Sequence, residues 1–245
     1  MFRTLLFHLL FWIEQLCTLP WLVYGLWLEK RGHTDRLRAL ARARNRIWTR
    51  CQLAWGGVKV RLHGTVDLPA DRGAVVVSNH QGAFDIPLLG RCLGRDVAFV
   101  AKIELARVPI VGTWMRFMGC QFINRADRRQ SLGVFKAAGE ELRRGAWIVI
   151  FPEGTRSHRQ EMALFKKGSL SLAVKVGAPI LPVAISNSWK IQGASMDPIR
   201  PGVVDLHILP AIDPTRLTPA ELDGLSEKVQ ADIAAKLGVP VPPPG

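Results

Sequence analysis

The chain has 245 residues, a mean hydropathy of +0.12, and 33 Lys or Arg residues against 20 Asp or Glu residues. This length suits one sizeable α/β domain with an appendage, and the hydropathy is too low for a protein with many membrane spans. The four cysteines include no C-x-x-C pair, which argues against a disulfide framework and indicates a reducing compartment.

Positive charge is concentrated in one early segment. Residues 29–61 hold ten Lys or Arg residues against two acids, which gives +8 of the formal net charge of +13. Such a segment attracts polyanions, either nucleic acid or an anionic membrane surface. Because an apolar segment directly precedes it and no nucleic-acid recognition module is visible, we expect a membrane surface as the partner and no nucleic acid.

The first apolar segment, residues 2–28, is interrupted by Glu14, Gln15 and Pro20. A spanning helix needs about 20 predominantly apolar residues, and a carboxylate at its centre costs roughly 2.5–3.5 kcal/mol. A helix that enters the bilayer partway, or lies in its interface, avoids this cost. Four aromatic residues suit the headgroup level: Trp12, Trp21, Tyr24 and Trp27.

A second helix is expected over residues 34–55, with apolar residues along one face. Four arginines spaced four residues apart follow another face: Arg38, Arg42, Arg46 and Arg50. A basic amphipathic helix after an apolar one predicts a membrane-associating helical hairpin over residues 1–55, on the cytoplasmic leaflet. The alternative is that both helices pack on the domain and the arginines are solvated.

From residue 56 to residue 238, strands alternate with helices. The expected strands are 58–62, 74–78, 96–101, 121–123, 147–151, 180–185 and 203–209. The expected helices are 85–93, 109–118, 127–144, 167–175 and 219–237. This alternation predicts an α/β domain with a mixed, mostly parallel sheet flanked by helices on both faces. The proline-rich residues 239–245 form a frayed tail.

His80 precedes Asp85 in an H-x4-D pattern, directly after the apolar run 74–77. A histidine at a strand end, with a carboxylate returned by a tight turn, is a general base with its orienting partner. Because no good serine or cysteine nucleophile is visible, we expect a substrate hydroxyl to attack directly after His80 takes its proton. The alternative is a histidine that merely satisfies a backbone group.

Three cations follow strand ends and extend this site. Arg125 offers a planar fork of donors suited to phosphate, and Lys102 and Arg156 add positive charge at the same rim. Since ligands of such sheets gather at the carboxyl ends of the strands, we expect one site for a phosphate-bearing substrate. The absence of a P-loop, G-x-G-x-x-G or G-x-S-x-G pattern argues against nucleotide hydrolysis, dinucleotide binding and α/β-hydrolase chemistry.

The segment 151–157, F-P-E-G-T-R-S, is the most specific signal among the polar clusters that follow the strands. Gly154 lets the backbone approach a ligand, and Glu153 can accept a bond from a hydroxyl or hold an arginine. The alternative is a turn followed by a helix cap at Thr155 or Ser157.

Four motifs in order resemble those of the glycerophosphate-type acyltransferases, most closely the bacterial 1-acyl-glycerol-3-phosphate acyltransferases. The matches to N-H-x4-D are Asn79, His80 and Asp85. The matches to the second motif are Gly119, Phe122, Ile123 and Arg125, with Asn124 where an aspartate is commonest. F-P-E-G-T-R-S is complete, and the fourth motif is matched by Ile180, Leu181, Pro182 and Val183.

The resemblance implies transfer of an acyl group from acyl carrier protein or coenzyme A, without another cofactor or a metal, to lysophosphatidic acid. The product would be phosphatidic acid, made at the cytoplasmic face of the inner membrane. It implies that His80 is the base and Asp85 its partner. It assigns the acceptor to Lys102, Arg125, Glu153, Gly154, Thr155 and Arg156.

Two alternatives remain open. The acceptor could be another lipid, such as a lyso-ornithine lipid or another lysophospholipid, or glycerol 3-phosphate. In a different class, the chain could be a non-catalytic lipid-binding scaffold.

Overall fold

Seven strands form one sheet in the computed structural model, which describes residues 1–69, 72–124, 128–194 and 197–242, with the backbone alone for residues 128–132. The strand order is β1-β7-β6-β2-β5-β3-β4. The strand bounds are β1 Val58–His63, β2 Ala74–Ser78, β3 Val97–Lys102, β4 Gln121–Ile123, β5 Trp147–Ile150, β6 Ile180–Ser186 and β7 Gly202–Ile208.

Strands β6, β2, β5, β3 and β4 run parallel, whereas β7 is antiparallel to β6 and pairs in parallel with β1. The predicted mixed, mostly parallel sheet is therefore confirmed. Because five neighbouring strands share one direction, their carboxyl ends lie along one edge of the sheet. This edge carries the residues that follow β2 (79–80), β5 (151) and β4 (124), together with Lys102 at the end of β3.

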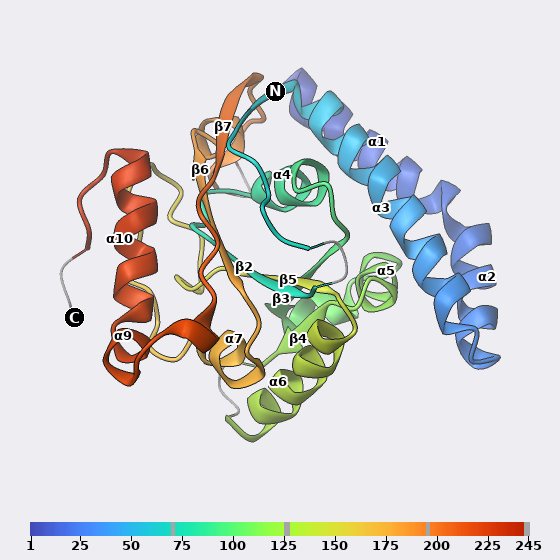
Figure 1. Ribbon diagram of the computed structural model, residues 1–245. Coiled ribbons are helices and arrows are strands. Elements are labelled where there is room, and N and C mark those ends of the chain that lie inside the picture. Colours follow the sequence, from blue (N-terminus) through green and yellow to red (C-terminus); the bar gives the residue numbers. More distant parts are fainter. Residues whose placement is uncertain (70–71, 125–127, 195–196, 243–245) are drawn as a thin grey trace.

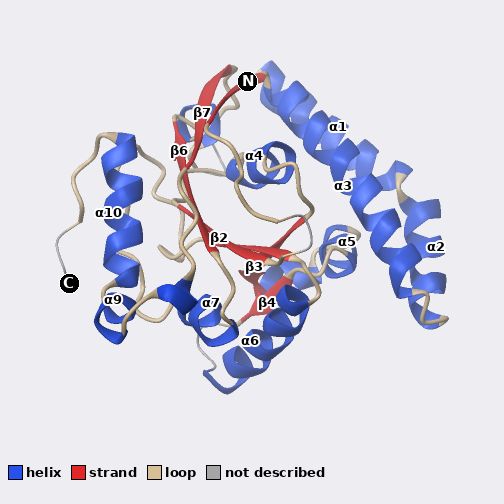
Figure 2. Cartoon of the chain, in the orientation of Figure 1, coloured by secondary structure: helices blue, strands red, loops and turns tan. Residues whose placement is uncertain are grey.

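Helices cover both faces of this sheet (Figures 1 and 2). Their bounds are α1 Phe2–Cys17, α2 Leu19–Lys30, α3 Thr34–Gly56, α4 Asp85–Cys92, α5 Val111–Phe117, α6 Arg128–Arg143, α7 Ser171–Val176, α8 Trp189–Gln192, α9 Pro219–Asp223 and α10 Leu225–Leu237. Two 3₁₀ turns occupy Ile103–Arg107 and Pro214–Arg216. The helix expected over 219–237 is broken at Gly224 into α9 and α10, and the one expected over 167–175 starts later, at Ser171.

Alternate residues of the central strand β2 enter two different cores. Val76 packs in a cluster with Leu88 of α4, on one face of the sheet. Val75 and Val77 pack on the other face, in a cluster that contains Val229 of α10. A strand buried on both sides has no polar face, which explains the continuous apolar run that ends at the predicted base.

The first three helices lie along one side of the molecule, opposite α10 (Figure 1). Helices α1 and α2 meet at Thr18 with a bend of 46°. In the described part of the chain, no one helix is both long and apolar enough for a membrane crossing. Together, the bent pair meets this condition by length and composition.

Helix α3 packs along α4 and buries Asn45, Thr49 and Leu53. Two of the four spaced arginines pair with acids of the domain: Arg38 lies 2.8 Å from Glu141, and Arg42 lies 3.4 Å from Asp96. Arg46 and Arg50 are exposed. The second arm of the expected hairpin is therefore also a layer of the α/β domain.

Candidate active site

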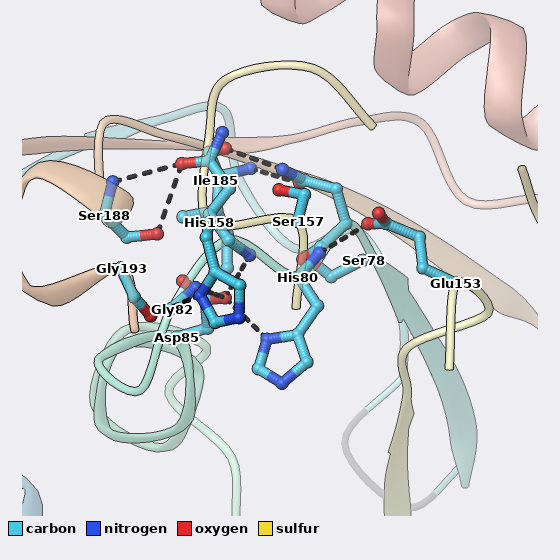
Figure 3. Close-up of polar contacts among 12 residues, drawn as sticks. Ser78, His80, Gly82, Asp85, Glu153, Ser157, His158, Ile185, Ser188 and Gly193 are labelled. Carbon is cyan, nitrogen blue, oxygen red and sulfur yellow. Dashed lines mark hydrogen bonds and ion pairs between the residues drawn. The ribbon is translucent and has the colours of Figure 1, made fainter. Parts of the chain in front are cut away.

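The predicted base and its partner are in direct contact. His80 follows β2 by two residues, Asp85 begins α4, and the Nδ1 atom of His80 lies 2.7 Å from Oδ2 of Asp85 (Figure 3). Because an ionised carboxylate can only accept, this contact places the imidazole proton on Nδ1 and leaves Nε2 as a proton acceptor. Figure 3 shows the second ring nitrogen pointing away from Asp85. The arrangement is that of a general base.

The H-x4-D spacing wraps the chain around the buried carboxylate of Asp85. Its Oδ2 atom also accepts the backbone N–H groups of Gln81, at 2.7 Å, and Gly82, at 3.0 Å. A Cβ atom on Gly82 would lie 2.5 Å from the carbonyl oxygen of Gln192, so the turn needs glycine there. Three donors on one oxygen fix the direction of the carboxylate toward the ring.

Phe151 holds the plane of the imidazole. Its ring stacks on that of His80 with centroids 4.0 Å apart and an angle of 16°. Sequence reasoning treated Phe151 only as part of a motif and missed this contact. The available signal was its place: Phe151 directly follows β5, which pairs with β2, and so emerges beside His80.

Glu153 fixes the backbone beneath the base. Its carboxylate accepts the N–H groups of His80 and Ala163, each at 2.7 Å, and the residue is 3% exposed. Burial raises the pKa of this carboxyl to about 7, although the two backbone N–H groups act in the opposite direction. Both oxygens are bonded to the backbone inside the domain, and the expected contact of Glu153 with a substrate hydroxyl or an arginine stays a prediction.

The strand exit at the base is held from two further sides. The side-chain amide of Asn79 donates to the carbonyl of Ile185 at 2.9 Å and accepts from its N–H at 2.8 Å. The N–H of Ser157 donates to the carbonyl of His80 at 2.7 Å. These bonds tie the histidine to β6 and to the end of the F-P-E-G-T-R-S segment, so the base stands on a rigid support.

The expected substrate-binding residues lie at the same edge of the sheet, as far as they are described. Lys102 is exposed at the end of β3 and pairs in register with Ile123, the last residue of β4. Arg125 lies outside the described residues. Gly154 is buried with a φ of +73°, Thr155 is exposed, and Arg156 is half-buried.

Comparison with known proteins gives the family. The family model described as acyltransferase matches residues 59–186, just over half of the chain. The chain belongs to the acyltransferase family. The resemblance drawn from the four motifs is thereby confirmed, and the matched residues run from β1 to the end of β6.

Curated acyltransferases are similar over much of the chain. A 1-acyl-sn-glycerol-3-phosphate acyltransferase of Chlamydomonas reinhardtii is 32% identical over 206 residues, which cover 83% of this chain and 61% of that protein. One of Borreliella burgdorferi is 31% identical over 184 residues, covering 74% of this chain and 72% of that protein. The chain thus spans less than two thirds of the algal relative's length.

A solved acyltransferase structure has the same fold. The crystal structure of the 1-acyl-sn-glycerophosphate (LPA) acyltransferase PlsC from Thermotoga maritima superposes with a TM-score of 0.77 at 31% identity. The match covers 97% of this chain and 95% of that one, so it includes the N-terminal helices.

Proposed function

We propose that the chain is an O-acyltransferase that moves a fatty acyl group from a thioester to the free hydroxyl of 1-acyl-glycerol 3-phosphate, giving phosphatidic acid. The observation that carries this proposal is the His80–Asp85 pair, with Nε2 of the ring left as a base at the sheet edge. The activity for which the similar proteins are named supports the same acceptor.

The reaction proceeds in two steps around the imidazole. Nε2 of His80 takes the proton of the acceptor hydroxyl as its oxygen attacks the thioester carbonyl, and Asp85 stabilises the resulting imidazolium. The tetrahedral intermediate then collapses, the carbon–sulfur bond breaks, and the imidazolium returns the proton to the thiolate. One ester forms and one thiol leaves, so the histidine is regenerated.

The acceptor is held by cations along the same edge. Lys102, Arg125 and Arg156 bind its phosphate, while Gly154 and Thr155 line the glycerol. Glu153 contributes by holding the backbone of His80. The acyl donor is a thioester of coenzyme A or acyl carrier protein, which acts as co-substrate, and this chemistry calls for no metal or further cofactor.

The reaction takes place at a membrane surface, on its cytoplasmic side. Many exposed side chains of α1 and α2 are large and apolar, among them Phe2, Leu5, Leu9, Trp12, Leu16, Trp21 and Val23. Burying them in lipid removes apolar area from water, and the exposed Arg46 and Arg50 add attraction to anionic headgroups. The acceptor then reaches the site from the bilayer in which it resides.

The test is an assay of the purified protein with radiolabelled lysophosphatidic acid, offering acyl-CoA and acyl carrier protein thioesters separately. We expect His80→Ala to lower kcat by about 10²–10⁴-fold, the usual contribution of a general base. His63→Ala, at the far edge of the sheet, is the matched control and should keep the wild-type rate. Undiminished acylation by His80→Ala would favour the non-catalytic scaffold.

A panel of acceptors tests the other alternative. Lyso-ornithine lipid, a second lysophospholipid and glycerol 3-phosphate are compared with lysophosphatidic acid at equal concentration. A higher kcat/KM for any of them would replace the proposed acceptor while leaving acyl transfer intact.

A further inference from the structure

Lys166 lies directly on the turn beside the base, although it belongs to none of the four motifs. A Cβ atom on Gly154 would lie 2.8 Å from both Nζ and Cε of Lys166, so the ammonium group covers that glycine. Gly154 has a φ of +73°, a conformation that lets the side chain lie close over bare backbone.

The backbone of Lys166 is held in place. Its N–H group donates to the carbonyl of Pro152 at 3.1 Å, and its carbonyl accepts from Ser169 at 3.1 Å. The preceding residue, Phe165, is 5% exposed in the core. The side chain therefore extends from a well-held backbone position over the turn at Gly154.

The same turn carries the parts that position His80. Phe151 stacks on the imidazole, and Glu153 accepts the N–H of His80. The ammonium group of Lys166 is thus placed, by residues 151–154, at the part of the sheet edge where the base stands.

This ammonium group is exposed, and within the described ranges no carboxylate forms an ion pair with it. The acid closest along the turn, Glu153, directs both oxygens to backbone N–H groups. A cation on the turn that supports the proposed base, with no carboxylate bound to it among the described residues, is suited to an anionic group of a substrate.

We propose that Lys166 binds the phosphate monoester of the acyl acceptor, an inference that rests on the proposed function. In 1-acyl-glycerol 3-phosphate the reacting hydroxyl and the phosphate sit on neighbouring carbons, so a hydroxyl at Nε2 of His80 places the phosphate a few bonds away. The charged groups of a coenzyme A or carrier-protein thioester are separated from the reacting carbonyl by the long pantetheine arm. A cation beside the base therefore suits the acceptor.

The test compares Lys166→Met with Lys167→Met and Lys166→Arg in steady-state assays that vary each substrate in turn. Lys167 is the matched control, because it is the next residue and is also exposed. The three atoms nearest to a Cβ atom on Gly154 all belong to Lys166 and none to Lys167. We expect Lys166→Met to raise the KM for lysophosphatidic acid at least tenfold and to leave the KM for the acyl donor within about twofold. Lys166→Arg restores most of the loss, and Lys167→Met changes neither value.

Each other outcome overturns the inference. A larger rise in the donor KM would assign Lys166 to the thioester, and equal effects of the two methionine variants would assign it to general surface charge. A fall in kcat alone, or an altered melting temperature, would assign it to the support of the turn. His80→Ala, run beside these variants, separates this inference from the proposed function: if it stays active, the function fails, and if it is inactive, the comparison of lysines decides on its own.

Discussion

Two buried carboxylates flank the same histidine and perform different tasks. Asp85 receives the ring N–H and two backbone N–H groups on one oxygen, so its charge faces the imidazole. Glu153 receives one backbone N–H on each oxygen, and burial raises its pKa to about 7. In the proposed reaction the first would orient the base and stabilise its positive charge, whereas the second holds the peptide from which His80 projects.

We predict that Glu153→Gln lowers kcat about tenfold with little change in KM. Glutamine offers one acceptor oxygen and one amide that only donates, so either His80 or Ala163 loses a buried partner, at a cost of roughly 1–3 kcal/mol. Steady-state kinetics of this variant beside Glu161→Gln, an exposed acid in the same loop, measures the effect. Wild-type kinetics in both would contradict the positioning role.

The same variant should change how stability depends on pH. The folded state of the wild type binds a proton at Glu153 more tightly than the unfolded chain does, so its free energy of unfolding falls as pH rises toward about 7. Relative to Glu153→Gln, this decrease is at most on the order of 3 kcal/mol, and it is complete above pH 7. Chemical denaturation between pH 5 and pH 8 measures the difference. If the free energies of unfolding of the wild type and of Glu153→Gln change with pH in the same way, Glu153 does not titrate in this range.

At the scale of elements, the continuous apolar runs predicted the central strands well, because a strand buried on both faces allows no polar residue. The helix expected from residue 167 instead starts at Ser171, since Gly168 takes a φ of +76° and the chain before it is bonded to Pro152. Gly224, with a φ of −91°, divides the last helix into α9 and α10. The start of α7 follows a contact with a distant segment, which the sequence periodicity does not reveal.

The contacts of the site show the same difference between local and distant segments. The His80–Asp85 contact was predictable because a single short turn creates it. The bond from Glu153 to Ala163, the stacking of Phe151 and the approach of Lys166 to Gly154 each join segments that are separate in the sequence. Residue spacing therefore indicated the contact of His80 with Asp85, whereas residue types alone did not indicate the backbone bonds of Glu153.

Helix α1 turns Glu14 and Gln15 inward, which changes the interpretation of its central carboxylate. Glu14 lies 2.8 Å from Nη1 of Arg44 on α3, and the guanidinium stands over the ring of Trp114 at 5.6 Å. Both charged side chains are largely buried, at 14% and 9% exposure. The carboxylate that argues against a membrane-spanning helix instead fastens α1 to the domain and leaves the apolar side outward.

We predict that Glu14→Leu lowers the free energy of unfolding by about 3 kcal/mol, because it leaves a buried guanidinium without its partner. The double variant Glu14→Leu/Arg44→Met should recover most of that loss. A double-mutant cycle by denaturant unfolding in detergent measures the coupling, with Glu29→Leu, an exposed acid on α2, as the control. Additive effects of the two single changes would show that the pair does not hold α1 in place.

At the scale of the whole molecule, one side carries a large apolar surface. This surface of α1 and α2, defined by Phe2, Leu5, Leu9, Trp12, Leu16, Trp21 and Val23, stays exposed. Helix α10 lies on the opposite side (Figure 1). Since α3 supplies buried residues against α4, removing residues 1–55 would damage the domain as well as this surface. Point substitutions on α1 therefore test membrane binding more cleanly than a truncation.

We predict that changing Leu5, Leu9 and Leu16 together to serine lowers binding to vesicles of phosphatidylcholine with anionic phosphatidylglycerol at least tenfold. These side chains are 69%, 58% and 56% exposed, so the protein core loses little, while the apolar area that lipid would bury is removed. Leu62→Ser, on the far strand β1, is the control and should bind as the wild type does. Co-sedimentation with the vesicles, at low and high salt, measures both variants.

The salt series separates the two forces in this membrane association. Charge attraction weakens as the Debye length shortens from about 10 Å at 0.1 M to about 3 Å at 1 M, whereas apolar burial does not. The wild type should therefore keep part of its binding at high salt, and the triple serine variant should lose nearly all of it. If the triple variant binds as the wild type does at every salt concentration, the apolar surface of α1 does not contact lipid.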